Sequence, residues 1–96
     1  QLEKLGAFSV VLECVPASVT SRIAEKLSIP VIGIGAGPDA DGQVLVWQDL
    51  LGMNLDFKPK FVRPFLKGGD LIQTALNQFA QDVQNKTFPS PKESFE

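Results

Sequence analysis

The chain has 96 residues, of which 44% are hydrophobic, and its 9 basic and 11 acidic residues give a formal net charge of −2. The charges are interspersed, without the basic cluster that nucleic-acid binding needs, which argues against a nucleic-acid partner. The single cysteine, Cys14, excludes an internal disulfide framework and is compatible with a reducing cytoplasm. No apolar run approaches the roughly 18 residues that a membrane span needs, so we expect a soluble, cytoplasmic protein without a membrane partner.

The first predicted strand covers residues 8–13. Gly6 stands where a preceding helix would stop, and the stretch "FSVVL" at 8–12 is apolar, β-branched and too short for a helix. Its apolar character is continuous rather than alternating, which is typical of a parallel strand covered on both faces. Pro16 then ends the extended segment.

A helix and a second strand are predicted next. Val19, Ile23 and Leu27 recur at spacings of four, which predicts an amphipathic helix over 17–28. The stretch "IPVIGIGAG" predicts an apolar strand over 29–37 that ends through its glycines. Strand, helix and strand at this spacing predict a βαβ unit with a right-handed crossover.

The segment "DGQVLVWQDLLG" is apolar enough to be a buried strand or a buried helix. We favour a helix that begins near Asp41, as its N-cap, and ends at Gly52. Residues 53–67 contain two prolines and three aromatic residues, which predicts an irregular connection with a short helical turn around "KFVRPFL".

The last predicted helix follows Gly68 and Gly69, with Asp70 as its N-cap and a regular apolar face that reaches Val83. Residues 86–96 have two prolines and no periodicity, so we expect an extended tail.

Two doubly covered parallel strands with three helices cannot close a sheet, so each predicted strand has an open edge. A small open α/β domain is one interpretation, and the last quarter of a larger α/β protein is the other. The start at Gln1, inside what reads as a helix end, and the continuous apolar strands favour the second. We therefore expect residues 1–96 to form a single segment of an incomplete domain.

Glu13 is the residue most suited to chemistry. It lies at the carboxyl end of a predicted parallel strand, where (β/α)8 barrels and open α/β sheets display their reacting groups. A glutamate placed there could act as a general base that removes a proton beside a carbonyl. The alternative is a structural carboxylate that accepts a hydrogen bond from a backbone amide or pairs with an arginine. The residues alone leave both interpretations open.

The glycines of "GIGAG" invite a phosphate-binding interpretation, because Gly35, Gly37 and Ala40 match the pattern G-x-G-x-x-A. Pro38, however, removes one of the amides that such a loop offers. We favour the interpretation that these glycines let backbone or ligand approach closely at a strand end. A free-standing phosphate-binding module remains the alternative.

Other candidate residues give weaker signals. The chain contains no histidine to activate Cys14, so we expect a buried apolar side chain there. No metal site is predicted, because the loop and helix aspartates lack the spacing of a calcium loop: Asp39, Asp41, Asp49 and Asp56. The aromatic residues are expected to be packing anchors or, failing that, a surface for an oligomer partner: Trp47, Phe57, Phe61 and Phe65. Lys60 and Arg63 are expected to be solvated charges.

Several motifs together are more specific than any one of them. They are "LECVP" (12–16), "IPVIGIGAG" (29–37), "DGQVLV" (41–46), "LG" (51–52), "PKFV" (59–62) and "FP" (88–89). In this order and spacing they resemble the carboxy-terminal part of the ketopantoate hydroxymethyltransferases. The resemblance covers essentially all 96 residues.

The resemblance implies a (β/α)8 TIM barrel, of which this chain would supply the last two βα units, a C-terminal helix and an arm. It implies hydroxymethyl transfer from 5,10-methylenetetrahydrofolate to 3-methyl-2-oxobutanoate, which gives ketopantoate for pantothenate biosynthesis. The glutamate of the family's "ECVP" motif is the expected base that removes the proton from carbon 3, and that position is Glu13. Mg²⁺ is expected to hold the oxo acid through ligands outside this segment.

The resemblance also implies partners. They are the remainder of the same barrel and further copies in a homo-oligomer, a decamer in the family, so the segment alone is expected to be inactive. Family tails often carry a histidine near "SF", whereas this tail reads "KESFE", and no role is carried onto it. A purely oligomer-forming role through the helices and arm is a third possibility.

Overall fold

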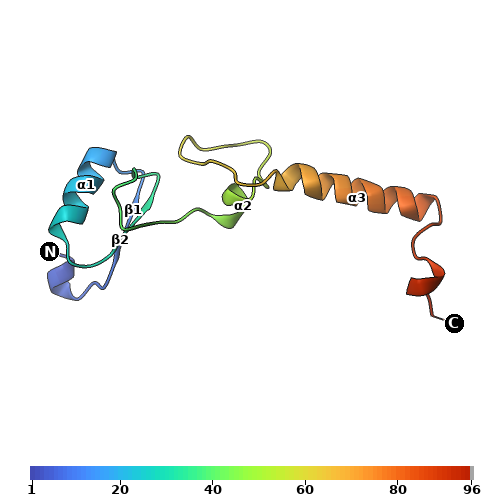
Figure 1. Cartoon of the computed structure of the whole chain (residues 1–96), viewed down its shortest axis with the longest axis horizontal. Coiled ribbons are helices and arrows are strands. Elements are labelled where there is room, and N and C mark those ends of the chain that lie inside the picture. Colours follow the sequence, from blue (N-terminus) through green and yellow to red (C-terminus); the bar gives the residue numbers. More distant parts are fainter. Residues whose placement is uncertain (96) are drawn as a thin grey trace.

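The computed structural model describes residues 1–95, which form an elongated molecule of 66 × 30 × 15 Å (Figure 1). Its radius of gyration is 21.9 Å, whereas a compact domain of similar length has one of about 13 Å. An α/β part lies at the amino-terminal end, and a long helix extends away from it (Figure 1). Much apolar surface is therefore left without a partner inside the described chain.

The α/β part contains a parallel sheet of three strands in the order β1-β2-β3. The strands are β1 (Val10–Glu13), β2 (Val31–Ile34) and β3 (Gly42–Gln43). Helix α1 (Ala17–Lys26) connects β1 to β2, which confirms the predicted strand, helix and strand. A 3₁₀ helix, Glu3–Leu5, precedes them and ends at Gly6 with φ of 96°, which confirms the predicted helix stop. The fold class is thus α/β with a parallel sheet.

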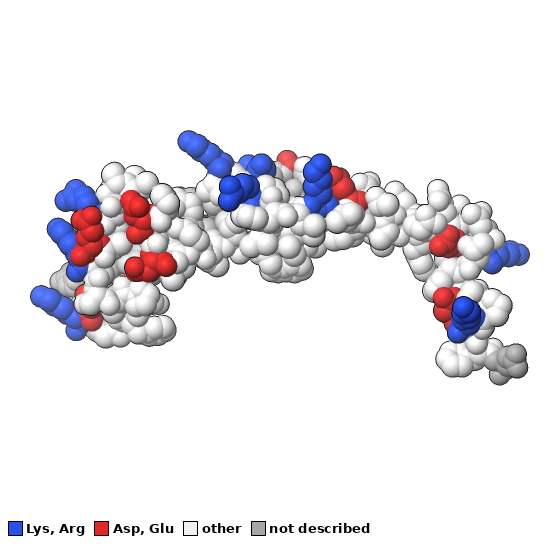
Figure 2. Space-filling view, viewed as in Figure 1, with Lys and Arg blue, Asp and Glu red and all other residues white. Residues whose placement is uncertain are grey.

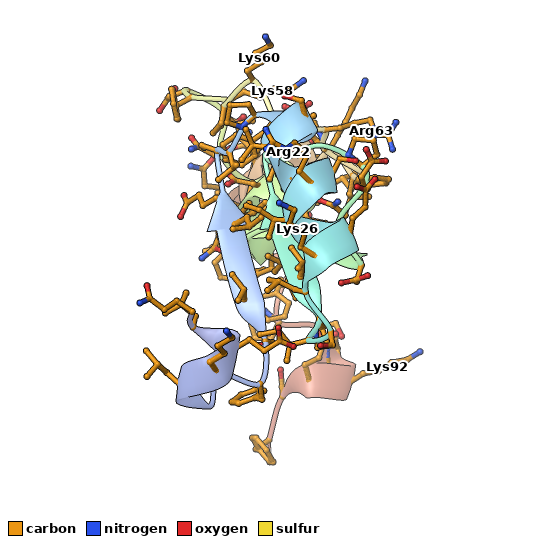
Figure 3. The ribbon with its side chains drawn as sticks, turned by 90° about the vertical axis from the view of Figure 1, so that its left-hand side faces the viewer. Arg22, Lys26, Lys58, Lys60, Arg63 and Lys92 are labelled. Carbon is orange, nitrogen blue, oxygen red and sulfur yellow. The ribbon has the colours of Figure 1, made fainter. Side chains whose placement is uncertain are left out.

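The two faces of this sheet differ in burial. Alternation along the strands and the pairing of Val10 with Val31 place Val10, Leu12 and Val31 on one face. Val31 is fully buried, and α1 packs against β2 (Figure 3). The opposite face carries Val11, which is 61% exposed, together with Glu13, Ile32 and Ile34.

The expectation that both faces are covered is therefore wrong for the described part of the chain. One connecting helix covers one face, and a parallel sheet needs a layer on each side to bury its continuous apolar strands. Val11 and Ile32 instead form an uncovered apolar face that ends at Glu13.

The predicted helix from Asp41 to Gly52 is also wrong. This segment begins with β3, and α2 (Trp47–Leu50) is a single turn. A carboxylate oxygen of Asp41 accepts a hydrogen bond from the N–H of Val31 (2.7 Å), and the Asp41 N–H donates to the Val31 carbonyl (2.8 Å). Asp41 thus fastens the start of β3 to the start of β2 instead of capping a helix. Pairing with a distant strand outweighs local helix propensity here.

Residues 53–67 form an irregular connection, as predicted. The expected helical turn around "KFVRPFL" is instead a β-turn, in which the Val62 N–H donates to the Pro59 carbonyl (3.0 Å).

Helix α3 (Gly68–Gln84) begins two residues before Asp70, with Lys67 at its N-cap, so the predicted cap is wrong. Its first amides are satisfied elsewhere, because Gly68 and Gly69 donate to the carbonyls of residues 51 and 52 at 2.8 and 2.9 Å.

Helix α3 is amphipathic and unpartnered within residues 1–95 (Figure 1). Its apolar side chains are 45 to 62% exposed: Leu71, Ile72, Leu76, Phe79 and Val83. The charged side chains gather mainly over the α/β part and the connecting loop, and α3 carries few of them (Figure 2). None of the helices formed by these residues is long and apolar enough to cross a membrane.

The tail is more ordered than predicted. It contains a 3₁₀ turn, Pro91–Glu93, capped by Ser90, so the extended-tail prediction for 86–96 is wrong over these residues, and Glu96 lies outside the described ones. The Ser90 hydroxyl accepts from the Lys92 N–H (3.3 Å), and the Glu93 carboxylate accepts from the Ser90 N–H (2.6 Å). This reciprocal pair is a capping box.

The capping box should respond to acid. The hydrogen bond from the Ser90 backbone N–H and then that from its side chain lower the pKa of Glu93. Because the folded pKa lies below the unfolded one, the stabilisation is complete above the unfolded pKa and is lost as the pH falls through the folded pKa. The Ser90 amide resonance should therefore titrate below the ordinary range of a glutamate in an NMR series. Glu93→Gln should abolish this titration, and a midpoint at or above that range would contradict it.

Candidate functional site

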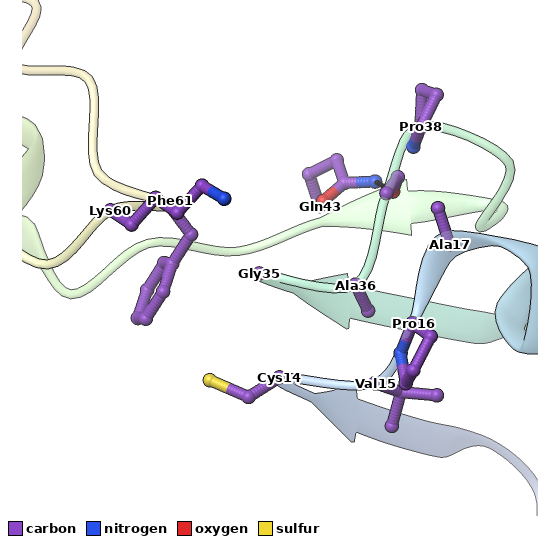
Figure 4. Close-up of a pocket in the computed structure, with 11 residues that line it drawn as sticks. Cys14, Val15, Pro16, Ala17, Gly35, Ala36, Pro38, Gln43, Lys60 and Phe61 are labelled. Carbon is purple, nitrogen blue, oxygen red and sulfur yellow. Dashed lines mark hydrogen bonds between the residues drawn. The ribbon is translucent and has the colours of Figure 1, made fainter.

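A pocket of about 910 Å³ lies at the carboxyl ends of β1 and β2 (Figure 4). Three parts of the chain line it: residues 14–17 after β1, residues 35–38 after β2, and the group Gln43, Lys60 and Phe61. The carboxyl ends of parallel strands are the usual place for ligands in α/β folds. The pocket is therefore the candidate functional site, and it joins segments that lie far apart in the sequence.

Close approach of the chain explains the glycines after β2. Gly35 has φ of +63°, and a Cβ there would lie 2.7 Å from Cγ of Phe61. Gly37 has φ of +84°, and a Cβ there would collide with the Cβ of Ala17 at the start of α1. Side chains are disfavoured at both positions by backbone and by space. The interpretation that these glycines permit close packing at a strand end is confirmed.

The structure argues against the phosphate-binding interpretation of the glycines after β2. A glycine-rich phosphate loop needs the N-terminus of a helix directly after it, where free amides point at the ligand. The loop after β2 leads instead into β3. Its shape is held by Gln43, whose side-chain amide donates to the Gly37 carbonyl (2.9 Å). Sequence reasoning missed Gln43, although its place in the "DGQ" motif was the available signal.

Glu13 is the last residue of β1 and lies opposite Ile34 on the uncovered face of the sheet. Its side chain is exposed and lies outside the pocket lining, while the next residue, Cys14, lines the pocket. Within residues 1–95 the Glu13 carboxylate accepts no hydrogen bond and forms no ion pair. The structural alternative, a bond to a backbone amide or to an arginine, therefore has no partner in the part of the chain that is described.

Cys14 differs from expectation, because it is exposed. It has a left-handed backbone with φ of 53°, and its N–H still donates to the Ile34 carbonyl (2.9 Å). The chain turns away from the sheet at this residue and leaves the thiol at the pocket wall, so the predicted burial is wrong.

The described residues form no cluster of metal-ligating side chains. No three His, Cys, Asp or Glu side chains among residues 1–95 lie close enough together to hold a metal ion. A magnesium ion takes oxygen ligands in near-octahedral positions, usually one or two carboxylates together with waters and substrate oxygens.

The aromatic and cationic residues of the connecting loop fall into two groups. Phe61 packs on Gly35 and is a packing anchor as predicted, whereas three others are exposed: Trp47, Phe57 and Phe65. The Arg63 guanidinium lies over the Phe65 ring, 4.9 Å from its centre, in a cation–π contact. Lys60 is exposed but also lines the pocket, which a purely solvated charge would not.

Comparison with known proteins gives relatives along the whole chain. The chain is 60% identical over 95 residues to a 3-methyl-2-oxobutanoate hydroxymethyltransferase of Bdellovibrio bacteriovorus, covering 99% of this chain and 36% of that protein. Proteins of the same name from Aliarcobacter butzleri and Bacillus subtilis are 54% and 52% identical over 94 residues, which are 98% of this chain and 35% and 34% of theirs. The chain thus spans about a third of the length of these relatives. The family model of ketopantoate hydroxymethyltransferase matches residues 1–91, and the chain belongs to that family.

Proposed function

We propose that this chain supplies the base and part of the substrate pocket of an enzyme that makes ketopantoate for pantothenate biosynthesis. The reaction transfers a hydroxymethyl group from 5,10-methylenetetrahydrofolate to 3-methyl-2-oxobutanoate. The observation that carries the proposal is the position of Glu13, which ends a parallel strand beside the pocket with an exposed carboxylate. The names of the relatives support the reaction class.

The proposed role of Glu13 is removal of the proton on carbon 3 of the oxo acid. The carbon–hydrogen bond breaks, the proton passes to a carboxylate oxygen, and the electron pair moves toward the carbonyl oxygen as an enolate. Water releases the one-carbon unit at the oxidation level of formaldehyde, and the two folate nitrogens take up the two protons of this water and leave as tetrahydrofolate. Carbon 3 of the enolate bonds to the released carbon, and the alkoxide that results takes the proton back from Glu13 to give the hydroxymethyl group. A positioned carboxylate that moves the proton in this way contributes about 10²- to 10⁴-fold to the rate.

The uncovered sheet face supports a further part of the proposal, that the chain is the carboxy-terminal portion of a TIM barrel. Val11, Ile32 and Ile34 would be covered by the interior layers of the other strands, and Glu13 would lie at the catalytic end of the barrel. The Mg²⁺ implied by the resemblance would be a Lewis acid for the oxo acid, held by ligands outside this segment. A homo-oligomer, a decamer by resemblance, is proposed with it.

A chimera tests the proposal. In it this chain replaces the matching 95 residues of the Bdellovibrio relative, so that the whole barrel is present. The chimera should form ketopantoate from 3-methyl-2-oxobutanoate and 5,10-methylenetetrahydrofolate, and the isolated chain should not. A folded chimera that makes no ketopantoate, beside an active relative, would contradict the proposal. Saturable phosphate or nucleotide binding by a monomeric, folded isolated chain would favour the binding-module alternative instead.

A further inference from the structure

We propose that the pocket at the ends of β1 and β2 is a subsite for a large ligand with a carboxylate, and that Lys60 binds this carboxylate. The inference rests on the proposed function, under which the reaction has two carboxylate-bearing reactants. It assigns the pocket to the folate donor and its glutamyl tail. The 2-oxo acid is placed outside the pocket, at Glu13.

The size of the pocket favours the larger reactant. Its volume of about 910 Å³ lies within the range of about 300 to 1,000 Å³ for ligand sites, and the pocket is open to solvent, so a long ligand can extend out of it. A short branched 2-oxo acid would leave most of this space filled with water. A pteridine joined to an aromatic ring and a glutamyl tail is of the appropriate size.

The chemistry of the lining favours a ligand that is apolar along its length and anionic at one end. Six apolar side chains contribute to the wall: Val15, Pro16, Ala17, Ala36, Pro38 and Phe61. Phe61 is held in place by its contact with Gly35, so its ring is a fixed surface for a flat group. Lys60 is the one charged residue of the lining, and within residues 1–95 its ammonium group has no ion pair.

Lys60 and Phe61 lie beside the end of β2, with Cys14 just after the end of β1 and Gln43 at the end of β3 (Figure 4). Glu13 precedes Cys14 and lies outside this lining. The base and the proposed donor subsite are thus adjacent along β1 without overlapping. A one-carbon unit carried by a ligand in the pocket would face the oxo acid at the end of that strand.

Kinetics of the Bdellovibrio chimera with single substitutions test the assignment. Lys60→Ala should raise KM for 5,10-methylenetetrahydrofolate about fivefold, the effect of losing one solvent-exposed ion pair. It should leave KM for the oxo acid and kcat unchanged, and Lys60→Arg should restore KM. Lys58→Ala is the matched control, because Lys58 is an exposed lysine two positions away that does not line the pocket. It should leave both KM values unchanged.

A donor whose glutamyl carboxylates are converted to carboxamides identifies the group that Lys60 contacts. With it, Lys60→Ala and the unaltered chimera should have equal KM values. A KM rise for the oxo acid alone, for neither reactant, or equally in Lys58→Ala would overturn the inference. If the unaltered chimera makes no ketopantoate, the proposed function fails by itself. Folate binding measured by calorimetry still tests the role of Lys60. A Kd for folate that Lys60→Ala leaves unchanged overturns the subsite, and a Kd that Lys60→Ala raises supports it.

Discussion

Replacing Glu13 with glutamine in the Bdellovibrio chimera is expected to slow deuterium exchange at carbon 3 of 3-methyl-2-oxobutanoate by about 10²- to 10⁴-fold. Glutamine has nearly the same shape and polarity, but its amide cannot take up the proton. Because Glu13 is exposed and bonded to nothing else within residues 1–95, its loss should leave the strand pairing and the stability unchanged. Loss of the carbon 3 proton signal in deuterated buffer, followed by NMR, measures the rate.

Two further variants separate a base from a general effect of charge. Glu25→Gln removes one negative charge from an exposed position on α1 and should leave exchange unchanged. Glu13→Asp keeps the carboxylate but withdraws it by one methylene, so exchange should recover in part. Equal exchange in Glu13→Gln and the unaltered chimera, with equal thermal unfolding, would remove Glu13 from the role of base.

The elements that were predicted correctly are those whose pattern is local. The apolar run before Pro16, the fourfold spacing in α1 and the apolar face of α3 are each set by neighbouring residues. No local pattern predicts strand β3, because it has two residues and exists only through its pairing with β2. Asp41 was assigned to a helix cap for the same reason, since its partner, the Val31 amide, lies ten residues earlier.

The candidate site likewise has one part that a local pattern predicts and one part that depends on distant contacts. The placement of Glu13 at a strand end follows from the strand and the proline after it, and the structure agrees. The pocket beside it could not be predicted, because residues 14–17 and Lys60 with Phe61 meet only in the folded chain. The contact of Phe61 with Gly35 brings the connecting loop to the strand ends, and no local pattern marks that contact.

The uncovered surfaces also show the difference between local patterns, which the sequence displays, and distant contacts, which it does not. Local patterning gives β1, β2 and α3 an apolar side, but two of these sides have no partner within residues 1–95. On the sheet, Val11 is exposed and Ile32 beside it is half-buried, and on α3 Leu76 and Phe79 are exposed. Helical and strand patterns specify which side is to be buried and leave open what buries it.

Replacing Gly37 with alanine is expected to destabilise the chimera by about 2 to 5 kcal/mol. The φ of +84° costs a side chain roughly 1 to 2 kcal/mol. The new Cβ would also collide with Ala17 at the first residue of α1, and such overpacking costs about 1 to 3 kcal/mol. Urea unfolding of the chimera measures the change.

Gly6→Ala separates the two causes, because Gly6 has a φ of +96° but nothing within 4 Å of the position of a Cβ. It should cost only the backbone part, about 1 to 2 kcal/mol. Adding Ala17→Gly to Gly37→Ala should recover the steric part, so the two changes would be non-additive. Equal losses in Gly37→Ala and Gly6→Ala would contradict the steric argument. Ala17 and Gly37 both line the pocket, one on each of two walls of the proposed donor subsite. Close packing between them therefore stabilises the fold and also holds these two walls together.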